Sequence, residues 1–355
     1  MRLFIRADSS LQIGTGHIMR CLTVATALRH HGFEPVFICR TLPGDVTSLV
    51  ERRGFDVRRL PPPAAGDASS DNDASLTRSA IGGETGWLIV DHYALDARWE
   101  RDVRPHVEGI VAIDDLADRP HACDALLDQG LYADAAIRYQ ALVGPATRLW
   151  LGPAFALLRD EFMHVGRNVR ARDGQVRRLL ISLGGSDPAG FTAMTLEAVR
   201  AVNGFQAAVD VVVPPSNPHR ARIVALAAGA RDVTVHGYVE RISDLMSAAD
   251  LAVGAAGMTA WERCAMGLPT VLLVLAKNQE NVAAGVAQAG AAWNLGDAGS
   301  VTRERVGSAI AHAVDAPDEV RRMSVAALAL MRGAGTSWRT SFLALMHGEA
   351  AYDPA

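Results

Sequence analysis

A short segment near the start of the chain combines charged side chains, two glycines and a histidine: Arg6, Asp8, Gly14, Gly16 and His17. The apolar residues before it predict a strand, and Ile18 onward predicts a helix. Glycines let a ligand approach the backbone, and the free N–H groups at the start of a helix point toward that ligand. The positive end of the helix disfavours the imidazolium, so we expect a neutral His17 that can accept a proton. A capping or surface histidine is the alternative.

This glycine loop does not match the fingerprint of a dinucleotide site. Met19 stands where a third glycine or alanine belongs, and the second predicted strand ends in Cys39 and Arg40 instead of an acidic residue. We therefore expect the glycines to leave room for a substrate other than a dinucleotide. Arg6 and Asp8 either contact the substrate or brace the loop.

The second half of the chain contains a more specific stretch, from Gly254 to Glu262. It follows a predicted strand and opens a predicted helix. Gly257 allows close backbone approach, and the amides of Met258 and Thr259, with the threonine hydroxyl, can hold a diphosphate. Glu262 lies one turn into the helix, where it can accept hydrogen bonds from two ribose hydroxyls. The alternative is a plain strand-to-helix turn with no ligand.

Three further turns in this half add polar groups at strand ends. The first supplies candidate diphosphate contacts, the second offers backbone groups to a flat base, and the third follows the last predicted strand. Either of the first two could instead be structural. The residues concerned are Gly184 and Ser186; Gly237, Tyr238 and Val239; and Lys277, Asn278 and Gln279. Lys277 is the only lysine of the chain, and its compact ammonium could neutralise a phosphate.

Polar residues also follow the predicted strands of the first half. Asp91 either caps a turn or faces a ligand, and Tyr93 could stack on a sugar or donate a hydrogen bond. Asp114 and Asp115 lack a third metal ligand at a fitting spacing, which favours loop ordering over a metal site. Asp128 closes a later strand and can be structural.

Composition narrows the class of protein. The net charge of −4, from 35 basic and 39 acidic residues, gives no sign of a nucleic-acid or membrane surface. The four cysteines form no Cys-x-x-Cys pair, which indicates free thiols in a reducing compartment. No stretch reaches the ~18 apolar residues of a membrane helix, and charges interrupt the only early apolar run, so no signal peptide is expected. The expected location is the cytoplasm.

Strands rich in Val, Ile and Leu alternate with amphipathic helices, which predicts an α/β protein with parallel, doubly wound sheets. We expect an N-terminal Rossmann-like domain over residues 1–162, an arginine-rich linker over 163–176, a second Rossmann-like domain over 177–335, and a helical tail over 336–355 that can pack back on the first domain. The Pro-, Ser- and Asp-rich residues 61–84 predict a mobile surface loop. The predicted strands are 3–6, 35–39, 55–60, 87–90, 109–113, 125–127 and 148–151, then 178–183, 208–213, 233–235, 251–253 and 270–275.

These motifs together resemble a known family. Gly257 through Glu262, the Gly-Leu-Pro at 267–269 and Gln279-x-Asn281 resemble the donor-binding half of MurG-like GT-B glycosyltransferases. The patterns at 6–20, 91–93, 113–119, 128–129 and 182–188 look like those of the UDP-sugar hydrolases of pseudaminic acid biosynthesis and of related spore-coat polysaccharide proteins. The resemblance covers nearly the whole chain, and residues 61–84 and the long tail depart from it. It implies a GT-B architecture, with the parallel sheets of two Rossmann-like domains facing across a cleft.

The resemblance also implies a reaction. Water attacks the anomeric carbon of UDP-2,4-diacetamido-2,4,6-trideoxy-β-L-altropyranose, UDP leaves, and the free sugar forms with inversion, without a metal or other cofactor. His17 carries over as the base, Tyr93 and Asn278 as residues near the sugar and the water, and the 257–262 stretch as UDP contacts. Met258 departs from the small or polar residue usual there. The expected partner is a UDP-sugar, and the oligomeric state is open, with a monomer favoured.

Two other hypotheses remain. A GT-B glycosyltransferase with a UDP-amino sugar donor would use His17 to deprotonate an acceptor hydroxyl. A binding module would sense UDP-sugars without turnover. The absence of an apolar and basic run in the first half favours hydrolysis over transfer at a membrane, and the intact His17 and Asn278 argue against a binding module.

Overall fold

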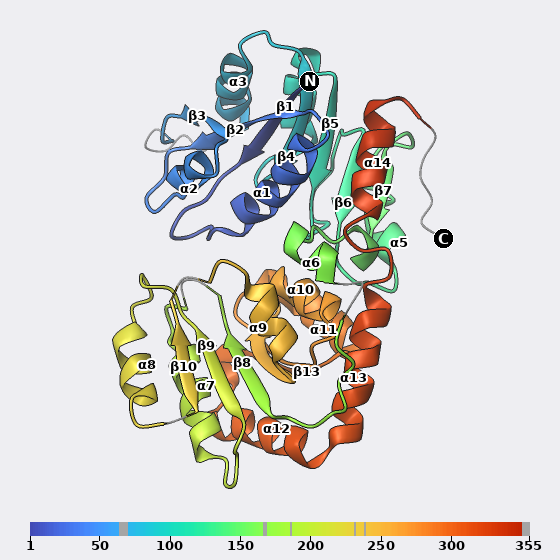
Figure 1. The fold of residues 1–355 in the computed structure, drawn as a ribbon. Helices are drawn as coiled ribbons and strands as arrows, with labels where there is room; N and C mark the ends of the chain where they lie inside the picture. The colour runs from blue at the N-terminus through green and yellow to red at the C-terminus, as the bar shows by residue number, and fades with distance from the viewer. Residues whose placement is uncertain (64–69, 166–168, 185–186, 231, 238, 350–355) are drawn as a thin grey trace. The chain divides into compact units, whose positions relative to one another are not determined.

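The computed structural model describes residues 1–63, 70–165, 169–184, 187–230, 232–237 and 239–349 (Figure 1). The chain forms two compact units: unit 1 comprises Met1–Leu157 and Gly333–Ala355, and unit 2 comprises Leu158–Arg332. The first crossing between units therefore lies five residues before the predicted boundary at 162. Within the described ranges, no helix has the length and apolar character to cross a bilayer.

Unit 1 contains a seven-stranded parallel sheet in the order β3-β2-β1-β4-β5-β6-β7. All seven strands predicted for this part of the chain are confirmed, with ends shifted by at most one residue. Their bounds are β1 Arg2–Ala7, β2 Glu34–Arg40, β3 Asp56–Leu60, β4 Gly86–Asp91, β5 Gly109–Ile113, β6 Ala125–Asp128 and β7 Arg148–Leu151.

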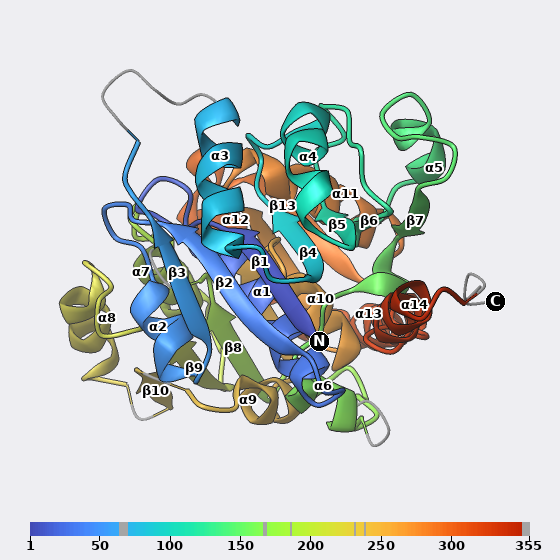
Figure 2. The same ribbon diagram turned by 90° about the horizontal axis from the view of Figure 1, so that it is seen from above.

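Helices cover both faces of this sheet (Figures 1 and 2). Leu3 and Ile5 of β1 belong to a buried cluster shared with α1, α2 and α14, whereas Phe4 between them belongs to a cluster shared with α3, α4 and α5. Because successive strand residues point to opposite faces, a strand buried on both sides has the continuous apolar sequence seen here. The helices are α1 Gly16–Arg29, α2 Thr47–Arg52, α3 Ser70–Ile81, α4 Ala97–Val103, α5 Ala135–Tyr139 and α14 Ser337–Met346, with short 3-10 turns η1 Arg104–His106 and η2 Pro153–Phe155.

Unit 2 repeats the plan with a six-stranded parallel sheet in the order β10-β9-β8-β11-β12-β13. Five of its strands match the prediction. The sixth, β13, was missed because Asn294 and Gly296 interrupt its apolar pattern. The elements are β8 Arg178–Ser182, β9 Ala208–Val212, β10 Val233–His236, β11 Leu251–Ala255, β12 Thr270–Val274, β13 Ala292–Asp297, α6 Asp160–Val165, α7 Phe191–Ala201, α8 Arg220–Ala227, α9 Ile242–Ala248, α10 Thr259–Ala265, α11 Glu280–Gln288, α12 Arg303–Asp315, α13 Pro317–Leu330, η3 Lys277–Gln279 and η4 Ala298–Ser300.

The stretch predicted as a linker does not run free between the units. Arg172 is 5% exposed, and its guanidinium donates to the backbone oxygens of Met246, Ala249, Met266 and Gly267 at 2.6–3.0 Å. These oxygens lie at the C-terminal ends of α9 and α10, where helices leave carbonyls without internal partners. The described part of 163–176 is therefore built into unit 2.

Both sheets have a point where the strand order reverses. In unit 1 this point lies between β1 and β4, and in unit 2 it lies between β8 and β11. Ligands of doubly wound sheets bind beyond the carboxyl ends of the strands at such a point. We therefore expect a ligand-binding site in the loops that follow these four strands.

The prediction of a mobile loop over 61–84 is wrong for its described second half, because residues 70–81 form α3. Asp73 in its first turn is 6% exposed and accepts from Arg6 at 2.7 Å, from Arg40 at 2.6 Å and from the indole of Trp99 at 3.0 Å. Acidic residues favour the first turn of a helix, so the polar run that resembled a loop is a helix start. The buried guanidinium groups fix this helix on the sheet.

We predict that Asp73→Ala lowers the free energy of unfolding of unit 1 by about 3–5 kcal/mol, because it breaks a buried ion pair and leaves charge uncompensated. Asp71→Ala is the matched control in the same turn, since Asp71 forms a half-exposed pair with Arg98 and should cost less than about 1 kcal/mol. Urea unfolding, with amide hydrogen exchange of α3, measures both. Equal losses in the two variants would contradict a special role for Asp73.

Candidate functional site

The loop after β1 and the end of β4 bring His17 and Asp91 together. His17 Nδ1 lies 2.5 Å from Asp91 Oδ1, although 74 residues separate them in the sequence. His17 is 5% exposed and Asp91 is completely buried. The parallel pairing of β1 with β4 places Ala7 beside Asp91, so the loop that follows β1 begins next to this carboxylate.

Arg20 completes this cluster from the next turn of α1. It donates to Asp91 through Nε at 2.5 Å and Nη2 at 2.6 Å, and to Asp115 through Nη1 at 2.8 Å. Burial on its own would raise the pKa of Asp91, but the charge of Arg20 and the hydrogen bonds from Arg20 and His17 hold that pKa well below its usual range. Asp91 is therefore an ionised acceptor.

This ionisation decides the tautomer of His17. A carboxylate only accepts hydrogen bonds, so Nδ1 of His17 carries the proton that points at Asp91. In the neutral ring, Nε2 then holds the lone pair. No described residue forms a hydrogen bond with Nε2, and this atom is not fully buried. The geometry thus leaves one basic nitrogen available, with the other fixed by a carboxylate.

The glycine loop leaves open space beside this histidine. Gly14 has φ +78°, a conformation that L side chains rarely adopt, and an added Cβ at Gly14 or Gly16 would meet no atom within 4 Å. Both residues are exposed. The predicted room for a ligand is consistent with this geometry.

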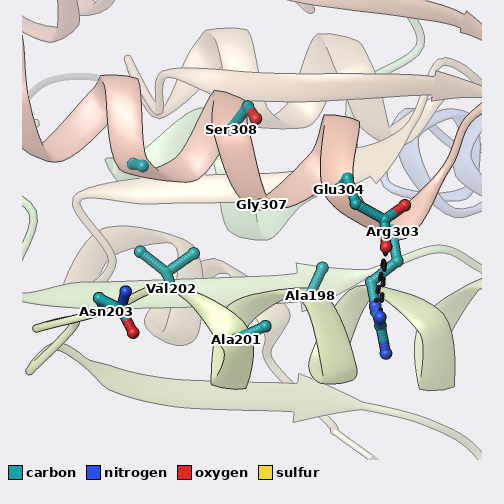
Figure 3. Close-up of a pocket in the computed structure, with 9 residues that line it drawn as sticks. Ala198, Ala201, Val202, Asn203, Arg303, Glu304, Gly307 and Ser308 are labelled. Carbon is teal, nitrogen blue, oxygen red and sulfur yellow. Dashed lines mark hydrogen bonds and ion pairs between the residues drawn. The ribbon is translucent and has the colours of Figure 1, made fainter.

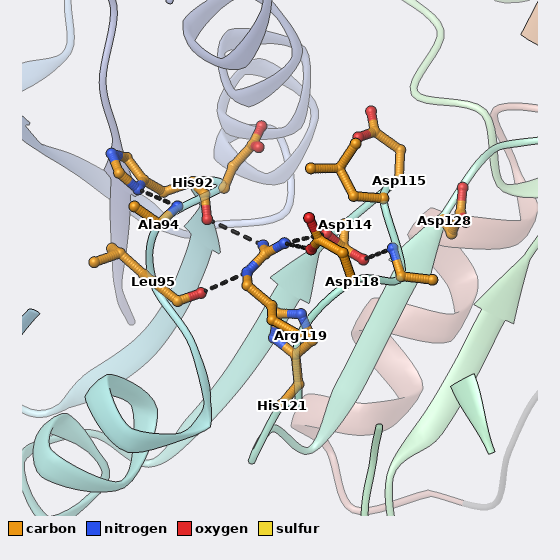
Figure 4. Close-up of polar contacts among 12 residues, drawn as sticks. His92, Ala94, Leu95, Asp114, Asp115, Asp118, Arg119, His121 and Asp128 are labelled. Atoms are coloured by element: carbon orange, nitrogen blue, oxygen red, sulfur yellow. Dashed lines mark hydrogen bonds and ion pairs between the residues drawn. The ribbon is translucent and has the colours of Figure 1, made fainter. Parts of the chain in front are cut away.

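Tyr93 lies against His17, with ring centroids 4.6 Å apart in an edge-to-face arrangement. Arg119 fixes the loop that carries it (Figure 4), donating to the backbone oxygens of His92 at 3.1 Å and Leu95 at 2.9 Å and to Asp114 at 2.8 Å. Sequence reasoning placed Asp114 in loop ordering, and its contacts are of that kind.

Arg6 and Asp8, predicted among the substrate contacts, are instead enclosed in unit 1. Arg6 is fully buried between Asp8, at 2.5 Å, and Asp73, at 2.7 Å. Asp8 is 2% exposed and also accepts from the backbone of Arg40 at 2.7 Å. Of the two roles left open by the sequence, these contacts favour the bracing one, because the charges already satisfy one another.

A second acidic cluster lies under the same sheet edge. The hydroxyl of Tyr139 is 3.0 Å from Asp114 and 2.9 Å from Asp128. One hydroxyl proton cannot serve two carboxylates, so one of them must carry a proton for both contacts to be favourable. Burial raises the pKa of Asp128 to about 6, although Gly130 and Arg138 donate to it, so Asp128 is the carboxyl that takes up this proton as pH falls toward 6.

In unit 2, the predicted diphosphate loop follows β11 and opens α10. Gly257, Met258 and Thr259 are partly exposed, and Ala256 just before them is fully buried. The side-chain amide of Gln279 lies 3.6 Å from the position of a Cβ on Gly257, so η3 borders the loop.

Glu262, the predicted ribose acceptor, is 3% exposed and forms a bidentate pair with Arg159 at 2.8 and 3.1 Å. Burial raises the pKa of Glu262, and Arg159 opposes this rise. Arg159 also pairs with Glu161 at 2.6 Å. Sequence reasoning missed Arg159, because 103 residues separate it from Glu262.

The remaining predicted contacts in unit 2 are scattered over several turns. Gly184 is exposed with φ +96°, but the amides that open α7 are taken by the carboxylate of Asp187, at 2.8 Å each. Those amides are therefore not free for a diphosphate. Other predicted residues are placed as follows: Gly237 and Val239 are partly exposed after β10, Lys277 and Asn278 are exposed on η3, and Ser186 and Tyr238 lie outside the described residues.

A hollow of about 430 Å³ lies between α7 and α12 of unit 2 (Figure 3). Its walls are mostly small apolar side chains, with the pair of Arg303 and Glu304 at one end. None of the predicted site residues lines it. In the described part of the chain, no group of three His, Cys, Asp or Glu side chains could hold a metal ion.

The fold, with parallel-sheet α/β architecture in each unit, is that of GT-B glycosyltransferases. The structure of MurG from Acinetobacter baumannii is similar, with a TM-score of 0.67 and 13% identity over 98% of this chain and all of that one. Residues 182–334 match the family model of the glycosyltransferase family 28 C-terminal domain.

Relatives of similar sequence give the finer resemblance. The chain is 25% identical to the UDP-2,4-diacetamido-2,4,6-trideoxy-β-L-altropyranose hydrolase of Campylobacter jejuni, covering 82% of this chain and 97% of the relative. It is 27% identical to the spore coat polysaccharide biosynthesis protein SpsG of Bacillus subtilis, covering 83% and 84%. An uncharacterized protein of Methanocaldococcus jannaschii is 24% identical over 77% of this chain, which spans only 55% of that relative's length. The resemblance inferred from the motifs is confirmed.

We predict that Asp128 makes stability fall as pH rises from about 4 to about 6. In this window the folded carboxyl keeps a proton that the unfolded chain has lost, so rising pH costs about 2–3 kcal/mol of folding free energy. Unfolding titrations of the wild type and Asp128→Asn across this range measure it, and the difference should shrink toward lower pH. The exposed Asp118→Asn control should keep the wild-type slope. Parallel curves for wild type and Asp128→Asn would exclude this assignment.

Proposed function

We propose that this chain is a UDP-sugar hydrolase in which His17 activates water for attack on the anomeric carbon. The observation that carries the proposal is the bond from His17 Nδ1 to the ionised Asp91, which leaves Nε2 as a free proton acceptor beside an open glycine loop. The names of the Campylobacter and Bacillus relatives support a sugar nucleotide as substrate.

In this reaction, Nε2 takes a proton as the water oxygen bonds to the anomeric carbon. The bond from that carbon to the phosphate oxygen breaks, its electron pair leaves with UDP, and the free sugar has the inverted configuration. A positioned general base contributes about 10²–10⁴ in rate. Asp91 stabilises the imidazolium that forms, as the carboxylate does in a serine-protease triad.

The UDP moiety is assigned to unit 2 in this proposal. Gly257, Met258 and Thr259 contact the diphosphate, and Glu262 the ribose hydroxyls. Lys277, Asn278 and Gln279 on η3, with Gly184, Ser186 and the turn of Gly237, Tyr238 and Val239, complete the proposed binding groups. On the side of unit 1, Tyr93 is the proposed sugar contact. The sugar is the diacetamido-trideoxy-altrose named for the Campylobacter relative, and the setting is nonulosonic acid biosynthesis in the cytoplasm.

A GT-B glycosyltransferase is the second candidate, favoured by the family 28 match over residues 182–334. It would use the same nucleotide groups, and His17 would deprotonate an acceptor hydroxyl instead of water. The two functions differ in whether UDP is released without an acceptor.

We expect the purified protein to release UDP from this UDP-sugar with no acceptor present, giving first the anomer opposite to that of the substrate. Proton NMR of the anomeric signals, followed from mixing, measures both products. His17→Asn should keep its affinity for UDP and lose turnover by about 10² or more. UDP release that begins only after an acceptor is added would exclude hydrolysis and support transfer.

Asp91→Asn should lower kcat by about 10²–10⁴ while UDP affinity stays constant, because an amide can present its N–H to Nδ1 and stabilise the wrong tautomer. Asp115→Asn is the matched control, since Asp115 contacts Arg20 and not His17. It should lower kcat much less. Steady-state rates with calorimetric UDP binding distinguish the two, and equal losses in both variants would refute tautomer control.

A further inference from the structure

One buried guanidinium in unit 2 lacks the partners that such a group normally has. Arg263 is 1% exposed, and its contacts are the carbonyl of Ala255 at 2.6 Å and the hydroxyl of Thr259 at 3.1 Å. Its Nε is buried without a partner. Among the described residues no carboxylate forms an ion pair with it. The charge of neighbouring Glu262 acts on Arg263, but that carboxylate is hydrogen-bonded to Arg159.

Arg172 shows how the same unit satisfies the donors of a buried guanidinium, again without an ion pair among the described residues. That side chain has four carbonyl oxygens around it, all three of its nitrogens donate, and it caps two helix ends. Arg263 has half as many contacts. A buried charge without compensation is costly, so its position beneath a loop calls for a functional explanation.

The contacts of Arg263 control the Thr259 hydroxyl. Arg263 donates to the oxygen of this hydroxyl and to the carbonyl of Ala255 at the end of β11. Because a guanidinium only donates, the hydroxyl keeps its own proton, and that proton points away from Arg263 toward an acceptor.

The backbone makes room for this arrangement. A Cβ on Gly254 would lie 2.5 Å from Nη1 of Arg263 and 2.6 Å from its Cζ. A glycine in the middle of the buried strand β11 therefore admits the guanidinium under the loop of Gly257–Thr259. Burial lowers the pKa of Arg263 to about 10, so the group remains charged at neutral pH.

We propose that Arg263 is a positioning residue of the diphosphate site: it directs the Thr259 hydroxyl proton to a phosphate oxygen and supplies a fixed positive charge to the bound diphosphate. This rests on the proposed function, which places the diphosphate at that loop. The missing counter-ion of Arg263 is then the substrate itself, and the charge is already in place when the ligand arrives.

The test compares ligands with and without the diphosphate. Calorimetry for UDP and ligand-observed NMR for uridine give dissociation constants for wild type, Arg263→Met, Arg263→Lys and Arg172→Met. Arg263→Met should weaken UDP by about tenfold or more, as expected for a hydrogen bond to a charged group, and leave uridine affinity unchanged. Arg263→Lys keeps the charge and should restore part of the loss.

Stability provides the contrast with a purely structural role. Arg263→Met should unfold at the same temperature as wild type or higher, because a buried charge without a counter-ion is removed. Arg172→Met should lower the unfolding temperature and leave the ratio of UDP to uridine affinity unchanged. If Arg263→Met does not fold, the Lys variant and Gly254→Ala, which displaces the guanidinium, carry the same comparison.

The outcomes separate the two proposals. A wild type that binds UDP, with Arg263→Met, Arg263→Lys and Gly254→Ala binding it equally well, overturns the role of Arg263 and leaves the proposed function standing. A wild type that does not bind UDP overturns both. Parallel losses of UDP and uridine affinity would show a structural effect and also overturn the proposal.

Discussion

The arrangement of side chains at the carboxyl edge of the unit 1 sheet depends on the buried carboxylate of Asp91. Removed from water, it would be costly without Arg20, whose two donors hold it as an anion. That anion then fixes the proton of His17 on Nδ1. The sequence suggested a histidine kept neutral by a helix end; the structure adds a carboxylate, so orientation and charge stabilisation come from a side chain.

A second network of buried charges fixes the start of the glycine loop. Arg6, Asp8, Asp73 and Arg40 link β1, β2 and α3. Because Arg6 and Asp8 flank the start of the glycine loop, their mutual pairing sets where the loop begins. Exposed loop residues can then surround a ligand while the backbone at both ends of the loop stays fixed. This arrangement is expected at the carboxyl edge of a doubly wound sheet.

The sequence predicts secondary structure from local patterns, but it does not predict which distant side chains form contacts. The strands of unit 1 were predictable because each is a continuous apolar run buried on both faces. Helix α3 was missed because acidic residues in its first turn also suit a loop. His17 and Asp91 were each singled out, but nothing local indicates their contact, which follows from the adjacency of β1 and β4. Arg159 and Arg263 carried no motif, and only burial with the identity of their partners distinguishes them.

The positions of the buried arginines give a physical reason why the single lysine of the chain is exposed. The excess of arginine over lysine in the chain does not by itself explain the places where arginine is buried. Arg20 and Arg172 each join several acceptors in different directions, which a planar fork with five donors can do and an ammonium on a flexible stem cannot. Lys277 instead lies exposed on η3. Buried sites need directed hydrogen bonds to offset desolvation, whereas an exposed site beside the proposed diphosphate loop needs only a charge on a flexible stem.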